Sequence, residues 1–245
     1  MPVKLFILGC PGCGKSHATR YVEKHLKMYF EKHVIVRRGW SYCVNDYTFL
    51  KQLFVFDQFI GEETQRRFKP TDYGGFEVLD PRVLDEALNS VRKIAIVSCK
   101  HSSYDLVIIE FARPNYSKAL QIFGDNFLQD AYFLFIDADL NACFERIQNR
   151  AANPQTLDDT FVSESTINLL YSEDNRLYMS VGLATDYELQ QRQVRCIDNM
   201  ISIEDFEAQL SEFFQFIFNW EFSKLPETDP AQLIPTTMFE SELAK

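Results

Sequence analysis

The sequence predicts an α/β fold in three layers, with a mainly parallel five-stranded sheet flanked by helices. Short apolar runs typical of buried strands alternate along the chain with stretches whose apolar residues recur at helical spacing, which is the pattern of successive βαβ units. The first run, residues 3–8, leads directly into a glycine-rich segment and then into a helix. The 245 residues are enough for one large domain with a sizeable core.

Each element follows from its own pattern of apolar residues. We expect strands at residues 3–8, 34–36, 105–110, 132–137 and 193–197. We expect helices at residues 17–27, 81–95, 117–129, 139–151, 163–171, 175–189 and 203–217. Residues 40–76 are rich in aromatic side chains and are expected to be less regular. The sequence thus predicts one domain over residues 1–222, with a lid region at about 146–163, and a disordered tail over 223–245.

The glycine-rich segment after the first strand reads Gly9-Cys10-Pro11-Gly12-Cys13-Gly14-Lys15-Ser16. It matches the spacing G-x-x-x-x-G-K-[ST], in which small residues let the backbone wrap a phosphate and the helix amino terminus adds positive potential. The Lys15 ammonium would reach the outer phosphates, and the Ser16 hydroxyl would bind Mg²⁺. We therefore expect ATP with Mg²⁺ as the cofactor. The candidate contacts are Gly9, Gly12, Cys13, Gly14, Lys15, Ser16 and His17.

Carboxylates follow two predicted strands, at the edge where parallel sheets hold their ligands. Glu110 ends the apolar run 105–110, as in a Walker B strand, where the acid orients a water bound to Mg²⁺. A buried strand that happens to end in glutamate is the alternative. Asp46, beyond the second strand, is equally consistent with contact to an acceptor substrate and with a surface turn. Tyr73, in the loop segment 72–76, is a second candidate for the acceptor site.

Arginines occur near the same predicted edge. Arg113 comes three residues after Glu110 and should lie near the same rim of the sheet. Arg146 and Arg150 lie one turn apart on one helix face, where two planar guanidinium groups can bracket phosphate oxygens. Surface ion pairs of the two arginines with Asp139 and Glu145 are the alternative, and the spacing alone favours these pairs.

Composition excludes several classes of function. The formal net charge of −10 and the pI of about 4.9 disfavour nucleic acid and anionic membranes as partners. No long uncharged apolar run predicts a membrane span, and the chain enters a strand almost at once instead of a signal peptide. The scattered cysteines indicate reduced thiols in the cytoplasm. We interpret Cys10 and Cys13 as loop residues in preference to a redox switch, and no second C-x-x-C completes a zinc site.

Taken together, these segments resemble the P-loop kinases of small molecules, the nucleoside, nucleotide and uridine-kinase-like enzymes. Residues 110–113, Glu-Phe-Ala-Arg, are similar to the edge at which nucleotide kinases hold the acceptor phosphate. Residues 146–150, Arg-Ile-Gln-Asn-Arg, are similar to their R-x-x-x-R lid arginines, and this likeness reverses the preference drawn from spacing. Residues 45–49, Asn-Asp-Tyr-Thr-Phe, look like the D-D-F-Y segment of uridine and nicotinamide-riboside kinases, whose Asp contacts the acceptor hydroxyl. The likeness covers about residues 3–217.

The resemblance implies a P-loop NTPase sandwich and a phosphotransferase that moves the γ-phosphate of ATP to a nucleoside, nucleotide or similar small acceptor. Its implied catalytic residues are Lys15, Asp46, Glu110, Arg146 and Arg150, its metal ligands Ser16 and Glu110, and its acceptor contacts Asp46, Tyr73 and Arg113. No D-D-F-Y segment is complete, so the acceptor does not follow. A nucleotide-dependent regulatory ATPase or switch, favoured by the aromatic last helix and acidic tail, and a kinase of nucleic-acid 5′ ends are the alternatives. Exposed aromatics on that helix also leave a homodimer open.

Overall fold

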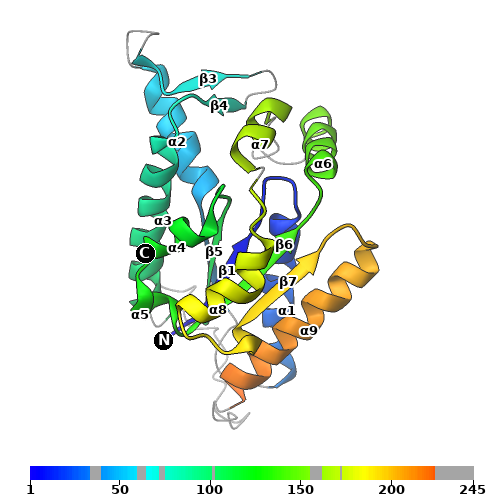
Figure 1. Cartoon of the computed structure of the whole chain (residues 1–245). Helices are drawn as coiled ribbons and strands as arrows, with labels where there is room; N and C mark the ends of the chain where they lie inside the picture. The colour runs from blue at the N-terminus through cyan, green and yellow to red at the C-terminus, as the bar shows by residue number, and fades with distance from the viewer. Residues whose placement is uncertain are drawn as a thin grey trace, which may run out of the picture.

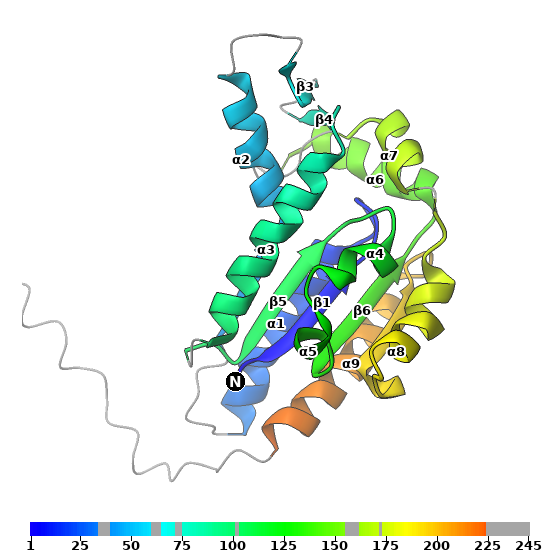
Figure 2. The same cartoon turned by 60° about the vertical axis from the view of Figure 1, so that its left-hand side comes forward.

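A computed structural model describes residues 1–33, 40–59, 65–71, 75–100, 103–154, 162–171 and 173–223. Its centre is a sheet of five parallel strands in the spatial order β2-β5-β1-β6-β7 (Figure 1). The strands are β1 (Val3–Leu8), β2 (Ser41–Asn45), β5 (Leu106–Phe111), β6 (Ala131–Asp137) and β7 (Val194–Asp198). Helices cover both faces of the sheet (Figures 1 and 2). The predicted fold class, a three-layer sandwich around a five-stranded parallel sheet, is confirmed.

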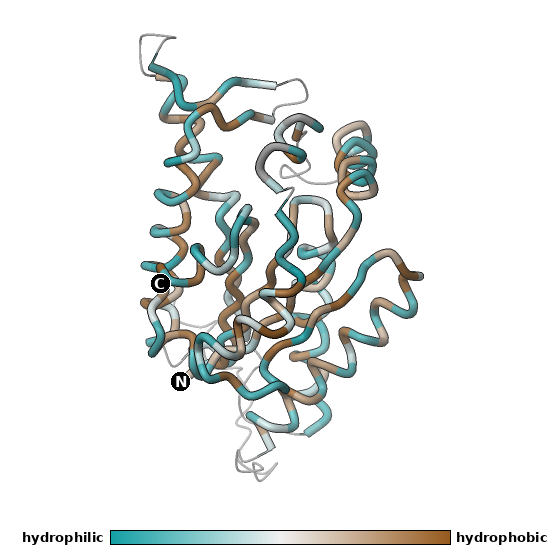
Figure 3. Tube along the Cα trace, in the orientation of Figure 1, coloured by the Kyte–Doolittle hydropathy of each residue, from teal (hydrophilic) through white to brown (hydrophobic). Residues whose placement is uncertain are grey.

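Alternate residues of the central strand serve the two faces of the sheet, because successive side chains of a strand point to opposite sides. Leu5 and Ile7 belong to the core under α1 (Lys15–Lys32) and α9 (Ile203–Phe222). Phe6 belongs to the core under α3 (Arg82–Lys100), and its ring stacks on Phe133 with centroids 4.9 Å apart. The inner strands β1, β5 and β6 are accordingly apolar at nearly every position, as expected for strands covered on both faces (Figure 3).

Shorter helices complete the layer that covers the same face of the sheet as α3. They are α4 (Tyr116–Gln121), α5 (Asp125–Leu128), the π-helical turn Tyr178–Gly182 and α8 (Leu183–Asp186). The single helix predicted for residues 117–129 is therefore wrong, because the chain turns at residues 122–124 and separates α4 from α5. Among the helices of the described residues, none is both long and apolar enough to cross a membrane.

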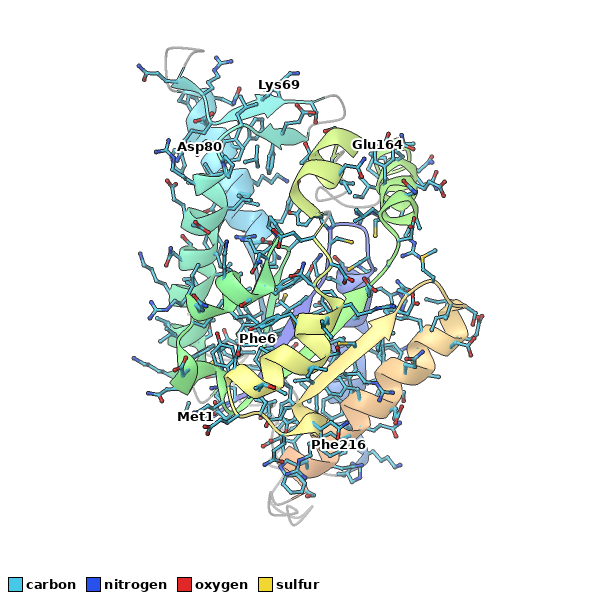
Figure 4. The ribbon with its side chains drawn as sticks, in the orientation of Figure 1. Met1, Phe6, Lys69, Asp80, Glu164 and Phe216 are labelled. Carbon is cyan, nitrogen blue, oxygen red and sulfur yellow. The ribbon has the colours of Figure 1, made fainter. Side chains whose placement is uncertain are left out.

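Two structures rise on opposite sides above the carboxyl end of the sheet. One consists of α2 (Asp46–Gln58), the first turns of α3 and the antiparallel hairpin β3 (Phe68–Pro70) with β4 (Phe76–Val78). The other consists of α6 (Leu140–Ala152) and α7 (Glu164–Tyr171). Lys69 on β3 and Glu164 on α7 mark the two sides (Figure 4). The candidate site lies below, where the strands end.

The second strand differs from the prediction. The expected strand 34–36 lies outside the described residues, and the edge strand of the sheet is β2. The region 40–76, expected to be less regular, contains β2, α2 and the hairpin. An edge strand needs few apolar residues, and only Val44 of β2 is buried, so its sequence lacks a strand pattern. The predicted tail likewise lies outside the described residues from 224 onward.

Candidate functional site

The glycine-rich loop joins β1 to α1 at the middle of the sheet. The chain connects β1 first to strands on one side and later to β6 and β7 on the other, so the loop lies at the switch point where open α/β sheets bind ligands. Gly9 and Gly14 have φ angles of 143° and 113°, which residues with a Cβ rarely adopt. A Cβ on Gly9 would lie 2.4 Å from the carbonyl oxygen of Ile136, so only glycine fits this approach to β6.

Neighbouring elements hold the loop in its wrapped shape. The Gly9 amide donates a hydrogen bond of 2.7 Å to the hydroxyl of Tyr116 on α4. Asn199, just past β7, donates from its side-chain amide to the carbonyl oxygen of Cys13 at 2.7 Å. These contacts come from opposite halves of the sheet, so the loop is preorganised for an anion instead of depending on the anion for its shape.

A cysteine cluster packs under the same loop. The Sγ atoms of Cys10 and Cys143 lie 3.2 Å apart, and Cys13 is buried beside them. The hydrogen bond with Cys13 favours the Cys10 thiolate, but the contact with Cys143 and burial outweigh it and raise the pKa of Cys10 to about 12. A thiol that stays protonated is a weak nucleophile, in keeping with the interpretation of Cys10 as a loop residue.

Lys15 lies folded over the loop. Its ammonium donates hydrogen bonds of 2.9 Å to the carbonyl oxygens of Gly9 and Cys10. Burial by itself would lower the pKa of Lys15, but the acidic groups of Cys13, Glu110, Cys10 and Asp46 outweigh burial and raise it. The side chain is therefore a buried cation that lies against the backbone of the glycine-rich loop.

Glu110 lies in β5 next to the start of α1. It accepts a hydrogen bond of 3.0 Å from the Thr19 hydroxyl, and the Ser16 hydroxyl lies close enough to act on its pKa. Burial raises the pKa of Glu110, although Lys15 and the two hydroxyls act in the opposite direction. A carboxylate beside a serine hydroxyl supplies the hard oxygen ligands that Mg²⁺ prefers, with phosphate and water completing the shell. Across the described ranges, no cluster of three or more His, Cys, Asp or Glu side chains could hold a metal without such help.

Asp46 and Arg113 form an ion pair inside the site. Asp46 opens α2 and also accepts a hydrogen bond of 3.3 Å from the Ala112 amide. Arg113 follows β5 and donates to the carbonyl oxygens of Ala112, at 2.6 Å, and Leu84. Asp46 is only 8% exposed, so it does not lie in a surface turn. The structure therefore brings together with Lys15 and Glu110 two of the three residues predicted to contact an acceptor.

The two lid arginines have different surroundings on α6. Arg146 donates a hydrogen bond of 2.7 Å to the carbonyl oxygen of Asn199, the residue that also binds the phosphate loop. Arg150 is exposed, and its guanidinium has no hydrogen bond or ion pair with any described residue, whereas its carbonyl oxygen accepts from the Asn153 amide. Asp139, the pairing partner considered from the sequence, instead caps α6 by accepting from two of its amides. Arg146 thus lies beside the loop, whereas Arg150 is exposed on the lid.

One further predicted contact, His17, does not lie with Lys15, Glu110, Asp46 and Arg113. The His17 Nε2 atom lies 2.9 Å from Glu207 Oε1 on α9, so the imidazole is turned away from the loop. Tyr73 lies outside the described residues.

The sequence did not reveal Tyr171, the last residue of α7. Burial, together with the charge of Asp46, raises the pKa of Tyr171 to about 12, while Arg113 and Lys15 act in the opposite direction. Its hydroxyl is thus within electrostatic reach of three site residues. No sequence motif marks a tyrosine at the end of a helix. Only the fold of the lid brings Tyr171 to the site.

Two hollows lie elsewhere and lack the chemistry of this site. One, of about 440 Å³, is lined in part by Arg67 and Arg82, whose charges are already paired with Glu86 and Asp80. The other, of about 360 Å³, lies between α1 and α9. Neither contains a glycine-rich loop or a carboxylate beside a free cation, so we assign the site to the phosphate loop.

The structure is similar to solved structures of kinases. It matches a gluconokinase from Sinorhizobium meliloti with a TM-score of 0.50 and 11% sequence identity, covering 91% of this chain and 98% of that one. It matches Chaetomium thermophilum Kti12, solved in complex with ADP-AlF3, with a TM-score of 0.51 and 15% identity, covering 89% and 98%. No protein-family model and no curated protein matches the sequence. At such identities the likeness shows architecture only. The chain has the fold of the P-loop kinases.

Proposed function

We propose that the chain is an ATP- and Mg²⁺-dependent phosphotransferase that moves the γ-phosphate to a hydroxyl of a small acceptor. The observation that carries this proposal is the position of Asp46, a buried carboxylate within electrostatic reach of Lys15 and Glu110. A kinase needs a group beside the outer phosphates that can hold an acceptor. The named activity of the gluconokinase neighbour supports the same reaction class.

The acceptor group we favour is an alcohol, as in a nucleoside or a similar metabolite. A monophosphate acceptor would need a free cation at this edge of the site. Arg113 is a weak candidate for that cation, because it pairs with Asp46 and donates to the carbonyl oxygens of Ala112 and Leu84, which leaves only part of its guanidinium, including Nε, without a partner among the described residues. Asp46, by contrast, keeps oxygen lone pairs that can accept a hydrogen bond from a substrate hydroxyl.

The mechanism assigns a separate task to each side chain. Lys15 binds the outer phosphates, and Arg146 and Arg150 approach them from the lid. Ser16 and Glu110 would hold Mg²⁺ directly or through water, and the ion would supply charge neutralisation at the phosphates. Asp46 orients the acceptor hydroxyl and accepts its proton. Because the transition state of phosphoryl transfer is loose, positioning and charge neutralisation account for most of the catalysis.

A second candidate is a nucleotide-dependent switch that phosphorylates nothing small. The likeness to Kti12, solved in complex with ADP-AlF3, is as close as the one to gluconokinase and supports use of a nucleotide without naming an acceptor. The two candidates share the phosphate loop and differ only in whether Asp46 meets an acceptor.

One experiment separates them. ATP consumption by the full chain is measured with Mg²⁺ and a panel of nucleosides, nucleotides and polyols. A kinase responds to one class with a large increase in turnover and yields a phosphorylated acceptor. A switch shows the same low turnover throughout the panel, and that result would overturn the phosphotransferase proposal.

A further inference from the structure

The Glu110 side chain is directed to the face of the sheet that α1 covers. Ile108, two residues earlier in β5, belongs to the core under α1, and residues two apart in a strand point to the same face. The neighbours of Glu110 in register are Ile7 of β1 and Asn45 of β2, so the carboxylate projects from an inner strand near the carboxyl end of the sheet. It therefore lies between the sheet and the start of α1.

One hydroxyl of α1 binds this carboxylate. The Thr19 hydroxyl donates a hydrogen bond of 3.0 Å to Oε2 of Glu110, and Thr19 is only 7% exposed. Thr19 follows Ser16 by three residues in α1, and residues three apart in a helix lie on the same face. Ser16, the proposed metal ligand, thus lies on the helix face that Thr19 presents to Glu110.

This hydrogen bond is not the one that a threonine inside a helix usually forms. Such a hydroxyl commonly donates to the backbone carbonyl one turn earlier, which in α1 is the carbonyl of Lys15. A hydroxyl has one proton to donate, and Thr19 directs it across the boundary between helix and sheet to Glu110. Glutamate has a long side chain with several rotatable bonds, so a donor on one oxygen restricts where the other oxygen points.

We propose that Thr19 is a positioning residue, whose hydroxyl fixes the Glu110 carboxylate in the orientation in which it binds Mg²⁺, directly or through water. Carboxylates that bind metals are themselves held by hydrogen bonds from a second layer of residues, and Thr19 supplies such a bond here. The inference rests on the proposed function only in requiring that Mg²⁺ bind with a nucleotide at Ser16 and Glu110. It does not require that any acceptor be phosphorylated.

The test measures binding of the metal, not turnover. The affinity of the full chain for ADP is measured by calorimetry over a series of free Mg²⁺ concentrations that begins in EDTA. The wild type is compared with Thr19→Val, which keeps the branched shape without the hydroxyl, and with Thr19→Ser, which keeps the hydroxyl. Thr185→Val is the matched control, because the exposed Thr185 on α8 donates only to the backbone carbonyl of Val181. Thr19→Ala, which also lacks the hydroxyl, replaces Thr19→Val if valine prevents folding.

Thr19→Val should raise the Mg²⁺ concentration at the midpoint of the series about tenfold or more, the usual effect of removing a residue that holds a metal ligand. Its affinity for ADP in EDTA should stay at the wild-type value, and Thr19→Ser and Thr185→Val should keep the wild-type midpoint. An unchanged midpoint in Thr19→Val, an equal loss of ADP affinity at every Mg²⁺ concentration, or the same shift in Thr19→Ser would overturn the inference and leave the proposed function intact. A wild-type chain whose ADP affinity does not respond to Mg²⁺ would overturn both the inference and the proposed role of the metal.

Discussion

Asp46 and Arg113 pair in the interior of the protein, although they come from elements far apart in the sequence. Asp46 opens the helix after the edge strand, and Arg113 follows the strand next to it. They are 8% and 4% exposed. Both side chains are largely shielded from water, so each charge depends mainly on the other and on the backbone groups of Ala112 and Leu84. The pair consequently has two roles: it supports the fold and it holds the candidate acceptor carboxylate in place.

The first prediction concerns the structural role of this pair. Arg113→Ala should lower the free energy of unfolding by about 3–5 kcal/mol, because it leaves the Asp46 carboxylate buried without its cation. Urea denaturation in the absence of ligand measures the change. Arg82→Ala, which removes an exposed arginine paired with Asp80, is the control and should leave the midpoint unchanged. Equal midpoints for the two variants would show that the buried pair does not stabilise the fold.

The second prediction concerns catalysis by the same carboxylate. Asp46→Asn keeps an oxygen that can accept from the Ala112 amide but removes the charge and the site for the acceptor proton. Turnover with the identified acceptor should fall by about 10²–10⁴-fold, the usual effect of losing a positioned acid–base group. ATP affinity should remain near the wild-type value. A rate equal to that of the wild type would mean that another carboxylate faces the acceptor.

The third prediction concerns Lys15. Lys15→Ala removes the buried ammonium that caps the carbonyl oxygens of Gly9 and Cys10. Turnover should become undetectable, because no other described residue places a cation in that position, while the far-UV circular dichroism stays native. Lys69→Ala on β3 is the control, since that lysine is exposed and its contact with Glu77 is a surface pair. Retained activity in Lys15→Ala would remove the phosphate loop from the mechanism.

The phosphate loop and the central strands were predictable because each depends on local sequence. Gly9 and Gly14 are required by backbone angles that other residues avoid, and the lysine and serine follow at fixed spacing. The strands β1, β5 and β6 lie between two layers of helices and are therefore apolar at nearly every position. In these segments, the local pattern and the folded environment impose the same requirement.

The remainder of the site depends on contacts between distant segments. Nothing near Asp46 in the sequence indicates that its partner is Arg113, and the two were predicted as separate contacts to an acceptor. No sequence motif marks Tyr171 or Tyr116. They reach the site only through contacts between distant segments, such as the hydrogen bonds that join Asn175 to the loop after β5. The strand β2 escaped prediction for a related reason, because an edge strand with one buried residue lacks the apolar pattern of a central one.

The last prediction concerns the pH dependence of Glu110. Burial raises the pKa of this carboxyl above its ordinary value, so the folded chain binds its proton more tightly than the unfolded chain does. As the pH rises from the ordinary value for glutamate through the raised one, the fold loses stability by ionising Glu110. Glu110→Gln abolishes this ionisation and can still accept the hydrogen bond from Thr19.

In the absence of nucleotide and metal, Glu110→Gln should therefore melt higher than the wild type at neutral pH, with the difference shrinking as the pH falls below the raised pKa. The same variant should lose Mg²⁺-dependent turnover, because a neutral amide is a poor ligand for a hard cation. Melting curves over a pH series, with and without Mg²⁺-ATP, measure both effects. A melting difference that stays constant over the series would show that Glu110 does not titrate in that range. The carboxylate would then serve the metal at no cost to the fold, in contrast to the trade-off between stability and function that its burial implies.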